Sequence, residues 1–459
     1  MNTVETITGI VGSNGILLGE DVSSRPVHPM RGTEGVAAQA IVRPATTEQV
    51  AAVLKLCNEV GQPIVTHGGR TGLAEGAIAS PQEIALSLER MTRIEEVDTV
   101  TGTMTVQAGV TLQAAQEAAE AAGFVLPLDL GARGSATIGG NISTNAGGNR
   151  VIRYGMMRDM VLGLEVVLAD GRVMTSLGKV IKDNAGYNLK HIFIGAEGTL
   201  GVVTRAVLRL RPKPLSQQTA IVACESFEAM PALLNDLNSR LGGAITAFEA
   251  MWQAFYELVT VKANRQPPLE ISYPYYVLVE AMGGDGAADQ ERFEAALGEA
   301  LESGLIVDAV IAKSQGEIDA MWAMRDDVGQ TRAIWGPSVG FDVSLPAPQM
   351  DEYLADIDAT IAARWPERKR AVFGHLGDGN LHLTYSVGKV DREIRDFIER
   401  TVYEALGKRG GSISAEHGIG TLKKEYLSLS RNEVEIGVMR DLKAMFDPNN
   451  ILNPGRVVD

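Results

Sequence analysis

The chain is poor in cysteine, in positive charge and in long apolar runs. Its 459 residues include only two cysteines, Cys57 and Cys224, so a disulfide framework is excluded and a reduced, cytoplasmic protein is expected. Lys and Arg total 42 against 57 Asp and Glu, and the formal net charge of −15 argues against nucleic acid or an anionic membrane as the main partner. No apolar run reaches about 18 residues, so no membrane span is expected. The N-terminus lacks the basic and apolar regions of a signal peptide.

Glycine, in contrast, is abundant and clustered. The length predicts two or three domains, and 45% hydrophobic with 22% charged residues is ordinary for a globular protein. The 50 glycines gather in a few runs, which indicates backbone that approaches a ligand closely. In so acidic a chain, an anionic ligand would have to be met by local Arg, Lys or backbone N–H groups.

Two of the six histidines stand on either side of a turn. The turn cluster at 377–380 lies between two alternating apolar runs, a pattern that predicts a β-hairpin with a four-residue loop. If Leu376 pairs with Leu381, the next pair outward is His375 with His382, with Cβ atoms about 5 Å apart. Two imidazoles at that separation can converge on one metal ion. The alternative is that both histidines only pack.

A third histidine follows a glutamate in another glycine-containing segment, 414–418. Glu416 would complete a two-nitrogen, one-oxygen metal site with an open position for substrate, with Zn favoured over Mn or Fe. His417 is then left for acid–base chemistry. The alternative for this segment is a surface Glu-His pair.

The first glycine loop follows a predicted strand–helix–strand unit. A strand at 40–43 leads to a helix that Thr46 and Gln49 begin as a capping box and that ends at Gly61. A strand at 63–66 then runs into His67-Gly68-Gly69-Arg70-Thr71-Gly72-Leu73, where successive N–H groups can wrap a pyrophosphate. The loop is neither a Walker A nor a G-x-G-x-x-G motif, and alone it is equally compatible with a plain turn.

Two further glycine segments strengthen the prediction of a ligand. Residues 131–148 hold almost no core-forming side chains but many hydroxyls and amides, as expected of a long ordered loop beneath a large, flat, polar ligand. Residues 193–204 read as strand, glycine loop and strand. Nearby, a strand at 164–168 runs into a tight hairpin turn at 169–172.

These segments carry a family resemblance. "PIVTHGGRTGLAEG", "PLDLGARGSATIGGNISTNAGGNRVIRYG" and "GAEGTLGVVT", in this order, resemble the FAD-binding domain of the vanillyl-alcohol oxidase and p-cresol methylhydroxylase (PCMH) superfamily. "GHLGDGNLH" and "SAEHGIG" resemble its FAD- and metal-dependent D-2-hydroxyacid dehydrogenases, which include D-2-hydroxyglutarate and D-lactate dehydrogenases. The resemblance covers nearly the whole chain.

The resemblance implies an FAD domain of two α/β subdomains and a set of residues that line the cofactor. His67 is a conceivable point of covalent flavin attachment, although a role as an ordinary loop residue is preferred. Asn453, before Pro454 in the C-terminal return, is expected either to reach the active site or to build a turn. The implied cofactor-binding residues are Gly68, Gly69, Arg70, Thr71, Gly72, Leu73, Pro127, Gly131, Ser135, Ile138, Gly139, Gly140, Thr144, Gly147, Gly201, Val203 and Asn453.

The second half alternates strands and helices without glycine loops. A turn at 211–214 marks the boundary, and the pattern predicts a mostly antiparallel sheet with helices on one face, a cap-like domain. We therefore expect an α+β protein with an FAD-binding domain at 1–212, a substrate cap with the metal site at 213–430, and a helical return at 431–459.

The expected reaction is oxidation of a D-2-hydroxy acid to the 2-oxo acid, with hydride transfer to flavin N5. His417 would be the general base, and Arg325 would bind the substrate carboxylate bidentately unless it only pairs with Asp326 or Asp327 at the surface. Asn380 or Asp378 would orient the substrate or merely build the turn.

One departure bears on the substrate. The 2-hydroxyglutarate enzymes carry a lysine just before the Phe-Asp pair and a threonine four residues after the arginine, where this chain has Gly340 and Gly329. Smaller substrates such as D-lactate are therefore admitted, and Thr331 or Arg332 could compensate.

Rival functions are an FAD oxidase of sugars or lactones and a non-catalytic flavin-binding subunit of a larger oxidase complex. The histidine hairpin argues against the first, and the complete set of metal and base residues argues against the second. The resemblance also implies an electron acceptor such as an electron-transfer flavoprotein or a quinone, and a homodimer is left open.

Overall fold

The structure, a computed structural model, describes residues 3–28 and 31–459 and divides into two compact units. The first unit comprises residues 1–148, 155–213 and 416–459, and the second comprises 149–154 and 214–415. The passage after Lys213 adjoins the boundary expected after residue 212. The return after Ala415 comes earlier than the boundary expected after residue 430, and the short excursion at 149–154 was not anticipated.

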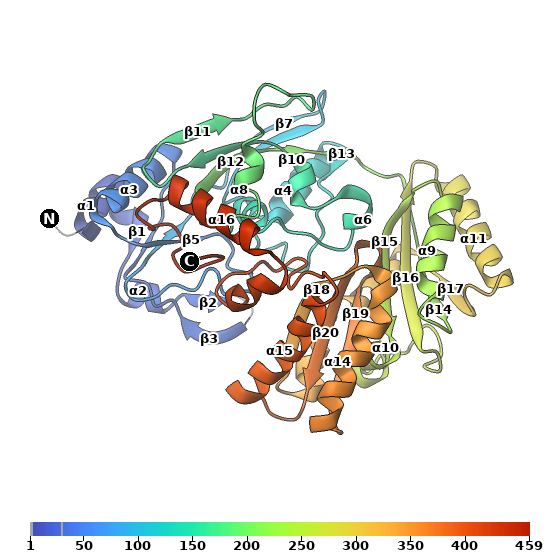
Figure 1. The fold of residues 1–459 in the computed structure, drawn as a ribbon. Coiled ribbons are helices and arrows are strands. Elements are labelled where there is room, and N and C mark those ends of the chain that lie inside the picture. Colours follow the sequence, from blue (N-terminus) through green and yellow to red (C-terminus); the bar gives the residue numbers. More distant parts are fainter. Residues whose placement is uncertain (1–2, 29–30) are drawn as a thin grey trace. The chain divides into compact units, whose positions relative to one another are not determined.

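The first unit contains two main sheets (Figure 1). One has the order β1-β4-β6-β5, in which β4, β6 and β5 run parallel, and the other is antiparallel with the order β11-β10-β12-β8-β7. The strands of the first sheet are β1 (Ile16–Leu17), β4 (Ala40–Val42), β5 (Ile64–His67) and β6 (Ile84–Ser87). Those of the second are β7 (Ile94–Asp98), β8 (Thr103–Gln107), β10 (Val161–Val167), β11 (Val173–Ser176) and β12 (Val202–Arg209). Two short ribbons, β2 (Pro26–His28) with β3 (Arg31–Gly35) and β9 (Phe124–Val125) with β13 (Arg211–Pro212), complete the strands.

Local capping explains where the helices of this unit begin. Thr46 accepts a hydrogen bond from the Gln49 N–H at 3.3 Å, and Gly61 ends helix α3 in the left-handed region, both as the sequence predicts. The predicted capping box is not completed, because the Gln49 side chain accepts from the Ala45 N–H at 2.8 Å and not from Thr46. The main helices are α1 (Thr3–Val11), α3 (Thr47–Val60), α4 (Leu112–Ala121), α5 (Ile138–Ser143) and α16 (Glu433–Phe446). Short helical turns are α2 (Glu20–Ser23), α7 (Met157–Met160) and α8 (Lys190–Phe193).

Two glycine segments differ from the prediction. Residues 131–148 are not one continuous loop, because Thr137 caps the N–H of Gly140 and starts helix α5. Phe193 ends helix α8 instead of belonging to a strand, so the segment 193–204 contains one strand only.

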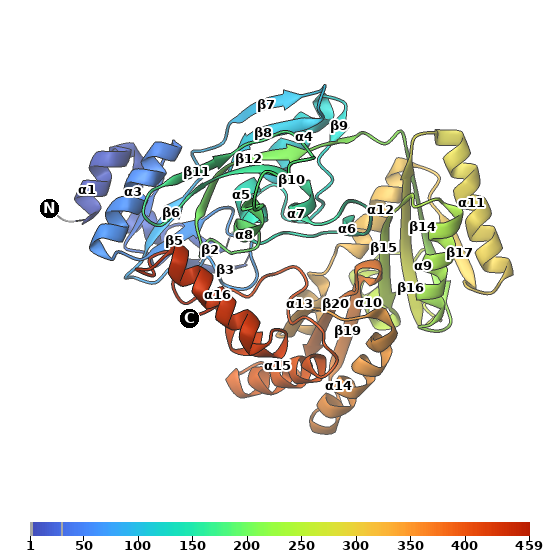
Figure 2. The same cartoon turned by 45° about the horizontal axis from the view of Figure 1, so that its top comes forward.

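The second unit is built on one seven-stranded antiparallel sheet with the order β17-β14-β16-β15-β19-β20-β18. Its strands are β14 (Ser216–Cys224), β15 (Ile245–Trp252), β16 (Tyr275–Gly283), β17 (Asp308–Ile311), β18 (Val339–Ser344), β19 (Lys369–His375) and β20 (Asn380–Ser386). Its helices are α6 (Val151–Tyr154), α9 (Ala229–Arg240), α10 (Gln253–Val259), α11 (Gly286–Glu302), α12 (Gln315–Arg325), α13 (Gln330–Trp335), α14 (Met350–Arg364) and α15 (Arg392–Gly407). Figures 1 and 2 show α14 beside α15, and α9 beside α11.

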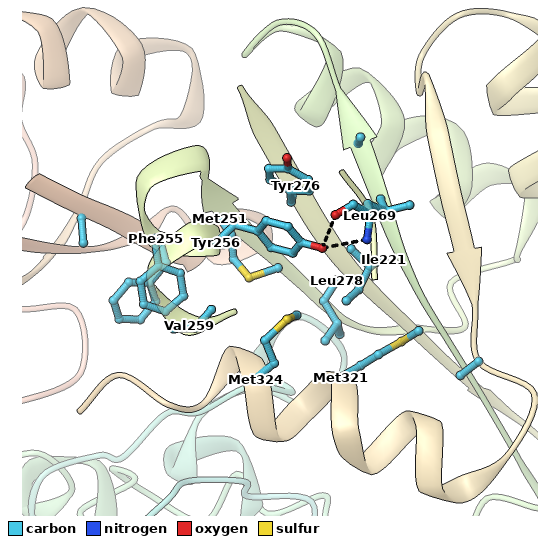
Figure 3. Close-up of a cluster of buried hydrophobic side chains, with 14 of the residues drawn as sticks. Ile221, Met251, Phe255, Tyr256, Val259, Leu269, Tyr276, Leu278, Met321 and Met324 are labelled. Atoms are coloured by element: carbon cyan, nitrogen blue, oxygen red, sulfur yellow. Dashed lines mark hydrogen bonds between the residues drawn. The ribbon is translucent and has the colours of Figure 1, made fainter. Parts of the chain in front are cut away.

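Helices cover both faces of this sheet, which corrects the expectation of helices on one face. Side chains of β14, β15, β16 and β19 join those of α10 and α12 in one buried cluster, shown in Figure 3. There the Tyr256 hydroxyl accepts from the Leu269 N–H at 2.9 Å, and Met321 and Met324 project from α12. Successive strand residues point to opposite faces, so Ala220 and Val222 face away from this cluster, and α11 packs on β14 there. The central strands are buried on both sides and therefore need two helical layers.

Candidate active site

The histidine pair lies in the hairpin β19–β20 of the second unit, but in a different register from the predicted one. Phe373, not His375, is the partner of His382 across the two strands, and a 3-10 turn at Leu376–Asp378 closes the hairpin. The shift is two residues, so both histidines stay on one face of the sheet. Their ring centroids are 5.4 Å apart at an interplanar angle of 82°, and a ring nitrogen of each lies within 4.8 Å of the other. His375 and His382 are therefore diagonal neighbours across the hairpin, and their rings still lie close together.

Each histidine stands beside a buried carboxylate that the sequence analysis missed. Glu249 of β15 is the cross-strand partner of His375, and its Oε1 lies 2.7 Å from His375 Nδ1. Asp342 of β18 is the cross-strand partner of His382, with a carboxylate oxygen within 4.8 Å of a ring nitrogen. A carboxylate on Nδ1 leaves Nε2 of His375 to face a metal, the arrangement that metal-binding histidines usually show.

Arg325 is buried at the end of α12 and pairs with Glu249. Its Nε donates to Glu249 Oε2 at 2.9 Å, and its Nη2 lies 2.6 Å from the same oxygen. Burial raises the pKa of Glu249, but the charges of Arg325 and His375 outweigh it and hold that pKa below its usual range. With 4% exposure Arg325 is not the surface residue of the alternative reading, although Asp326 lies 3.4 Å from Nη1. The guanidinium is therefore engaged by Glu249 through Nε and Nη2 and by Asp326 through Nη1.

Asn380 presents an acceptor in the same region. Its Nδ2 donates to Asp342 Oδ1 and to the Val343 carbonyl, both at 3.0 Å, and two acceptors on one side fix the orientation of the amide. Its Oδ1 is buried without a hydrogen-bond partner among the described residues. Asn380 can therefore accept a hydrogen bond from a ligand. Asp378 lies in the turn itself.

The first unit brings the predicted glycine segments together. A Cβ at Gly69 would collide with the Ser135 carbonyl oxygen, and one at Gly68 would come within 2.6 Å of Thr137 Oγ1. The loop 67–73 therefore packs directly on the second glycine segment, which only residues without side chains permit. Beside this contact, Nδ2 of Asn141 in α5 is buried with no partner among the described residues, an unused donor that suits an oxygen of a bound cofactor. A flat polar ligand such as FAD fits this cradle.

The remaining cofactor residues expected from the sequence also lie in the first unit. Gly201 and Val203 are buried where β12 begins, and a Cβ at Gly201 would come within 2.7 Å of Val166. Asn453 joins two segments: its Oδ1 accepts from the Thr66 N–H at 2.9 Å, and its Nδ2 donates to the Glu197 carbonyl at 2.7 Å. The side chain of Asn453 thus links two segments of the chain. Its backbone lies in a turn, with a φ of 44° and a carbonyl that accepts from the Arg456 N–H at 3.3 Å.

His67 is buried in the first unit, and its Nε2 lies 2.9 Å from the Ala77 carbonyl. Burial, helped by the charge of Arg70, lowers the pKa of His67 from 6.5 to about 4, so the ring is neutral near pH 7 and donates Nε2–H. These contacts give His67 a structural role, at the end of β5 instead of in the loop that follows it.

The neutral state of His67 predicts a pH effect on stability. The unfolded chain binds a proton at His67 below pH 6.5 and the folded chain only near pH 4, so stability falls as the pH drops through this window, by about 3 kcal/mol for this group. We expect His67→Gln to lose that part of the slope when the free energy of unfolding is measured at pH 7.5 and 4.5. Equal slopes in the two proteins would exclude His67 as the cause.

Glu416 and His417 belong to the first unit, whereas His375, His382, Arg325 and Asn380 belong to the second. Within the first unit a Cβ at Gly147 would come within 2.6 Å of Glu416 Oε1, so the second glycine segment runs past this carboxylate. The turn that follows is held by Glu197, which accepts the N–H groups of Ile419 at 2.7 Å and Gly420 at 2.8 Å.

Known proteins resemble the chain over its whole length. Residues 38–176 match the FAD binding domain model and residues 213–457 match the model for FAD linked oxidases, C-terminal domain. A Bos taurus protein named mitochondrial D-2-hydroxyglutarate dehydrogenase is 39% identical, over 92% of this chain and 77% of its own. A Schizosaccharomyces pombe protein with the provisional name of mitochondrial D-lactate dehydrogenase is 36% identical, over 99% and 90%.

A solved structure of p-cresol methylhydroxylase with substrate bound is 19% identical and covers 100% of this chain and 96% of its own, with a TM-score of 0.77. At that identity the likeness shows the fold alone, and it confirms the predicted α+β, PCMH-type fold. The cytoplasmic location expected from the sequence is contradicted, because these relatives are named as mitochondrial. Among the described residues, no helix is both long enough and apolar enough to cross a membrane.

Proposed function

Because the chain belongs to the FAD-dependent D-2-hydroxyacid dehydrogenases of the vanillyl-alcohol oxidase and p-cresol methylhydroxylase superfamily, we propose that it oxidises D-2-hydroxyglutarate or a related D-2-hydroxy acid to the 2-oxo acid. It is an oxidoreductase acting on CH–OH donors. The observation that carries the choice of substrate class is the converging pair His375 and His382 beside two buried carboxylates. An α-hydroxy carboxylate can chelate a metal ion through its carboxylate and its hydroxyl, and the two histidines could hold such an ion.

FAD would supply the hydride acceptor at flavin N5. The proposed cradle is the contact between the loop 67–73 and residues 135–140, supported by the glycine packing and by the unused donor of Asn141. A divalent metal, for which the donor set favours Zn, would supply a Lewis acid for the carboxylate and hydroxyl of the substrate.

The proposed metal ligands are His375, His382 and Glu416. The two histidines offer neutral nitrogens on one face of the sheet. For Glu416 the support comes from the covalent chain: Ser412 pairs with Ser344 at the end of β18, and four residues span at most about 14 Å. A two-nitrogen, one-oxygen set leaves a position for substrate.

The neighbouring residues have proposed roles of their own. His417, which follows Glu416 directly, takes the proton of the substrate hydroxyl as general base. Arg325 meets the substrate carboxylate with its guanidinium, and Asn380 accepts a hydrogen bond from the substrate through Oδ1. The reaction also needs an electron acceptor, for which an electron-transfer flavoprotein or a quinone remains our proposal.

The substrate side chain is the point on which the two named relatives differ. Gly329 precedes α13 and a Cβ there would meet nothing within 4 Å, while Gly340 on β18 is exposed. Neither position offers a charged group to a second carboxylate. D-lactate is therefore the second candidate substrate, and a non-catalytic flavin-binding subunit is the alternative if no acid is oxidised.

The test is anaerobic bleaching of the bound flavin by a panel of D- and L-2-hydroxy acids, with and without prior chelation. We expect one D-acid to bleach the flavin, with the effect lost on chelation and restored by metal. Bleaching by no acid, with FAD and metal both bound, would reject the proposed reaction. Rapid peroxide formation in air would favour an oxidase instead.

A further inference from the structure

Glu249 is a buried carboxylate that serves two different partners with its two oxygens. Oε1 accepts from His375 Nδ1 at 2.7 Å, and Oε2 accepts from Arg325 Nε at 2.9 Å. The residue is 1% exposed and lies near the middle of the sheet, on the face that also carries the buried cluster of Figure 3. One side chain therefore joins a β19 histidine to an α12 arginine.

The arrangement fixes the protonation pattern of both partners. An isolated buried carboxylate is costly, and the pairing with Arg325 offsets that cost. Because Oε1 is an acceptor only, His375 must carry its proton on Nδ1, and its Nε2 lone pair is turned away from Glu249. The same carboxylate holds the guanidinium plane of Arg325, whose ring neighbour is Phe373 at 5.2 Å.

We propose that Glu249 is a positioning residue that couples the metal ligand His375 to the substrate-binding Arg325, by holding His375 in the Nδ1–H tautomer and Arg325 in one orientation. This inference rests on the proposed function of these two residues. It assigns to Glu249 no contact with substrate or cofactor. Its effect on the reaction passes entirely through its neighbours.

The sheet provides a matched control in Glu280. This glutamate is 0% exposed, lies on the adjacent strand β16 and faces the same helix, since Trp322 of α12 donates Nε1–H to it at 2.9 Å. Arg150 donates to it at 3.0 Å, so it too is a buried carboxylate paired with an arginine. Its other donors are Gln217 at 2.7 Å and Thr246 at 2.7 Å. None of these residues is a proposed metal ligand.

A glutamine at position 249 can satisfy Arg325 or fix the His375 tautomer, but not both. Glu249→Gln keeps the shape but has one acceptor oxygen for two donors. If that oxygen stays with the charged Arg325, the amide presents N–H to His375, and the imidazole proton moves to Nε2, where a metal has to bind. Glu280→Gln removes an equally buried charge whose hydrogen-bond partners, among the residues that the structure describes, include no histidine.

The experiment compares wild type, Glu249→Gln and Glu280→Gln as FAD-bound proteins. Zn²⁺ affinity is measured by competition with a chelator, and the His375 tautomer by ¹⁵N chemical shifts of labelled histidine before and after Zn²⁺ addition. We expect Glu249→Gln to bind Zn²⁺ about 10–100-fold more weakly, and its His375 to carry the proton on Nε2. Glu280→Gln should keep the wild-type affinity and tautomer, and only Glu249→Gln should also raise KM.

Three results would overturn the inference: wild-type affinity in Glu249→Gln, an equal loss in both variants, or an Nε2–H tautomer in the wild type. The last needs no variant, so the test survives a Glu249→Gln protein that does not fold. Failure of the proposed function looks different. In that case the wild-type flavin is not bleached by any 2-hydroxy acid, while Zn²⁺ affinity and tautomer still report on Glu249.

Discussion

His417→Ala is expected to bind FAD and metal as the wild type does and to lose reduction of its flavin by the substrate. A positioned general base contributes about 10²–10⁴-fold to the rate of a proton transfer, so we expect a fall of at least about 10²-fold. His417 is not among the proposed metal ligands, and the turn after it is held through backbone N–H groups by Glu197. Alanine should therefore remove the base and leave this turn in place. Anaerobic stopped-flow reduction with the best D-acid measures the effect.

The control for this variant is His191→Ala. His191 lies in α8 of the same unit, where its Nδ1 is 3.1 Å from Arg158 Nη1, and no motif uses it. It should reduce its flavin at the wild-type rate. A His417→Ala protein with unchanged reduction would remove His417 from the mechanism and would leave proton removal to another group.

His382→Ala is expected to abolish both the bound metal and the reaction. The change removes one of two nitrogens of the proposed site, and even partners outside the ligand shell contribute about 10–100-fold to metal affinity. The metal content per FAD should therefore fall well below one, with FAD itself retained, because the cradle lies in the other unit. Elemental analysis and the flavin spectrum of the purified variant measure the two quantities.

Chelation of the wild type provides the comparison for His382→Ala. Wild type stripped of metal should behave like the variant, and added Zn²⁺ should restore the wild type only. If His382→Ala keeps stoichiometric metal, the two-nitrogen site is wrong. If His382→Ala loses metal but its flavin is still reduced by the substrate, the metal has a structural role. The proposal that the substrate chelates the metal is then wrong.

The sequence predicts the local elements well where a short-range signal decides them. The capped helix α3 and the hairpin between β10 and β11 appear as expected, because the Thr46 cap, the Gly61 terminus and the turn at 169–172 act within a few residues. The helix α5 was missed because a glycine-rich segment has low helix propensity. The Thr137 cap and the packing around α5 stabilise the helix in spite of this low propensity.

The histidine hairpin shows which part of a site prediction survives an error of register. The predicted pairing of His375 with His382 was wrong by two residues, yet the rings still meet, because a strand repeats its side-chain direction every two residues. A slip of one residue would have sent one ring to the opposite face. The two histidines therefore share a face for any shift of the pairing by an even number of residues, whatever the exact length of the turn.

Glu249 and Asp342 could not be found from the sequence. Each becomes a neighbour of a histidine only through strand pairing over a long separation along the chain, which no local pattern specifies. The signal available for Glu249 was a charged residue within the mostly apolar strand Ile245–Trp252.

The six-residue excursion at 149–154 has a consequence for chimaeric proteins. It leaves the glycine segment after Gly148, places Arg150 on Glu280 and Arg153 on the Met282 carbonyl, and returns at Gly155. A graft that moved only residues 214–415 into another flavoprotein would leave a buried glutamate without its arginine. Recombination must therefore transplant two separate stretches of the gene together, so that the second unit is inherited as a discontinuous piece.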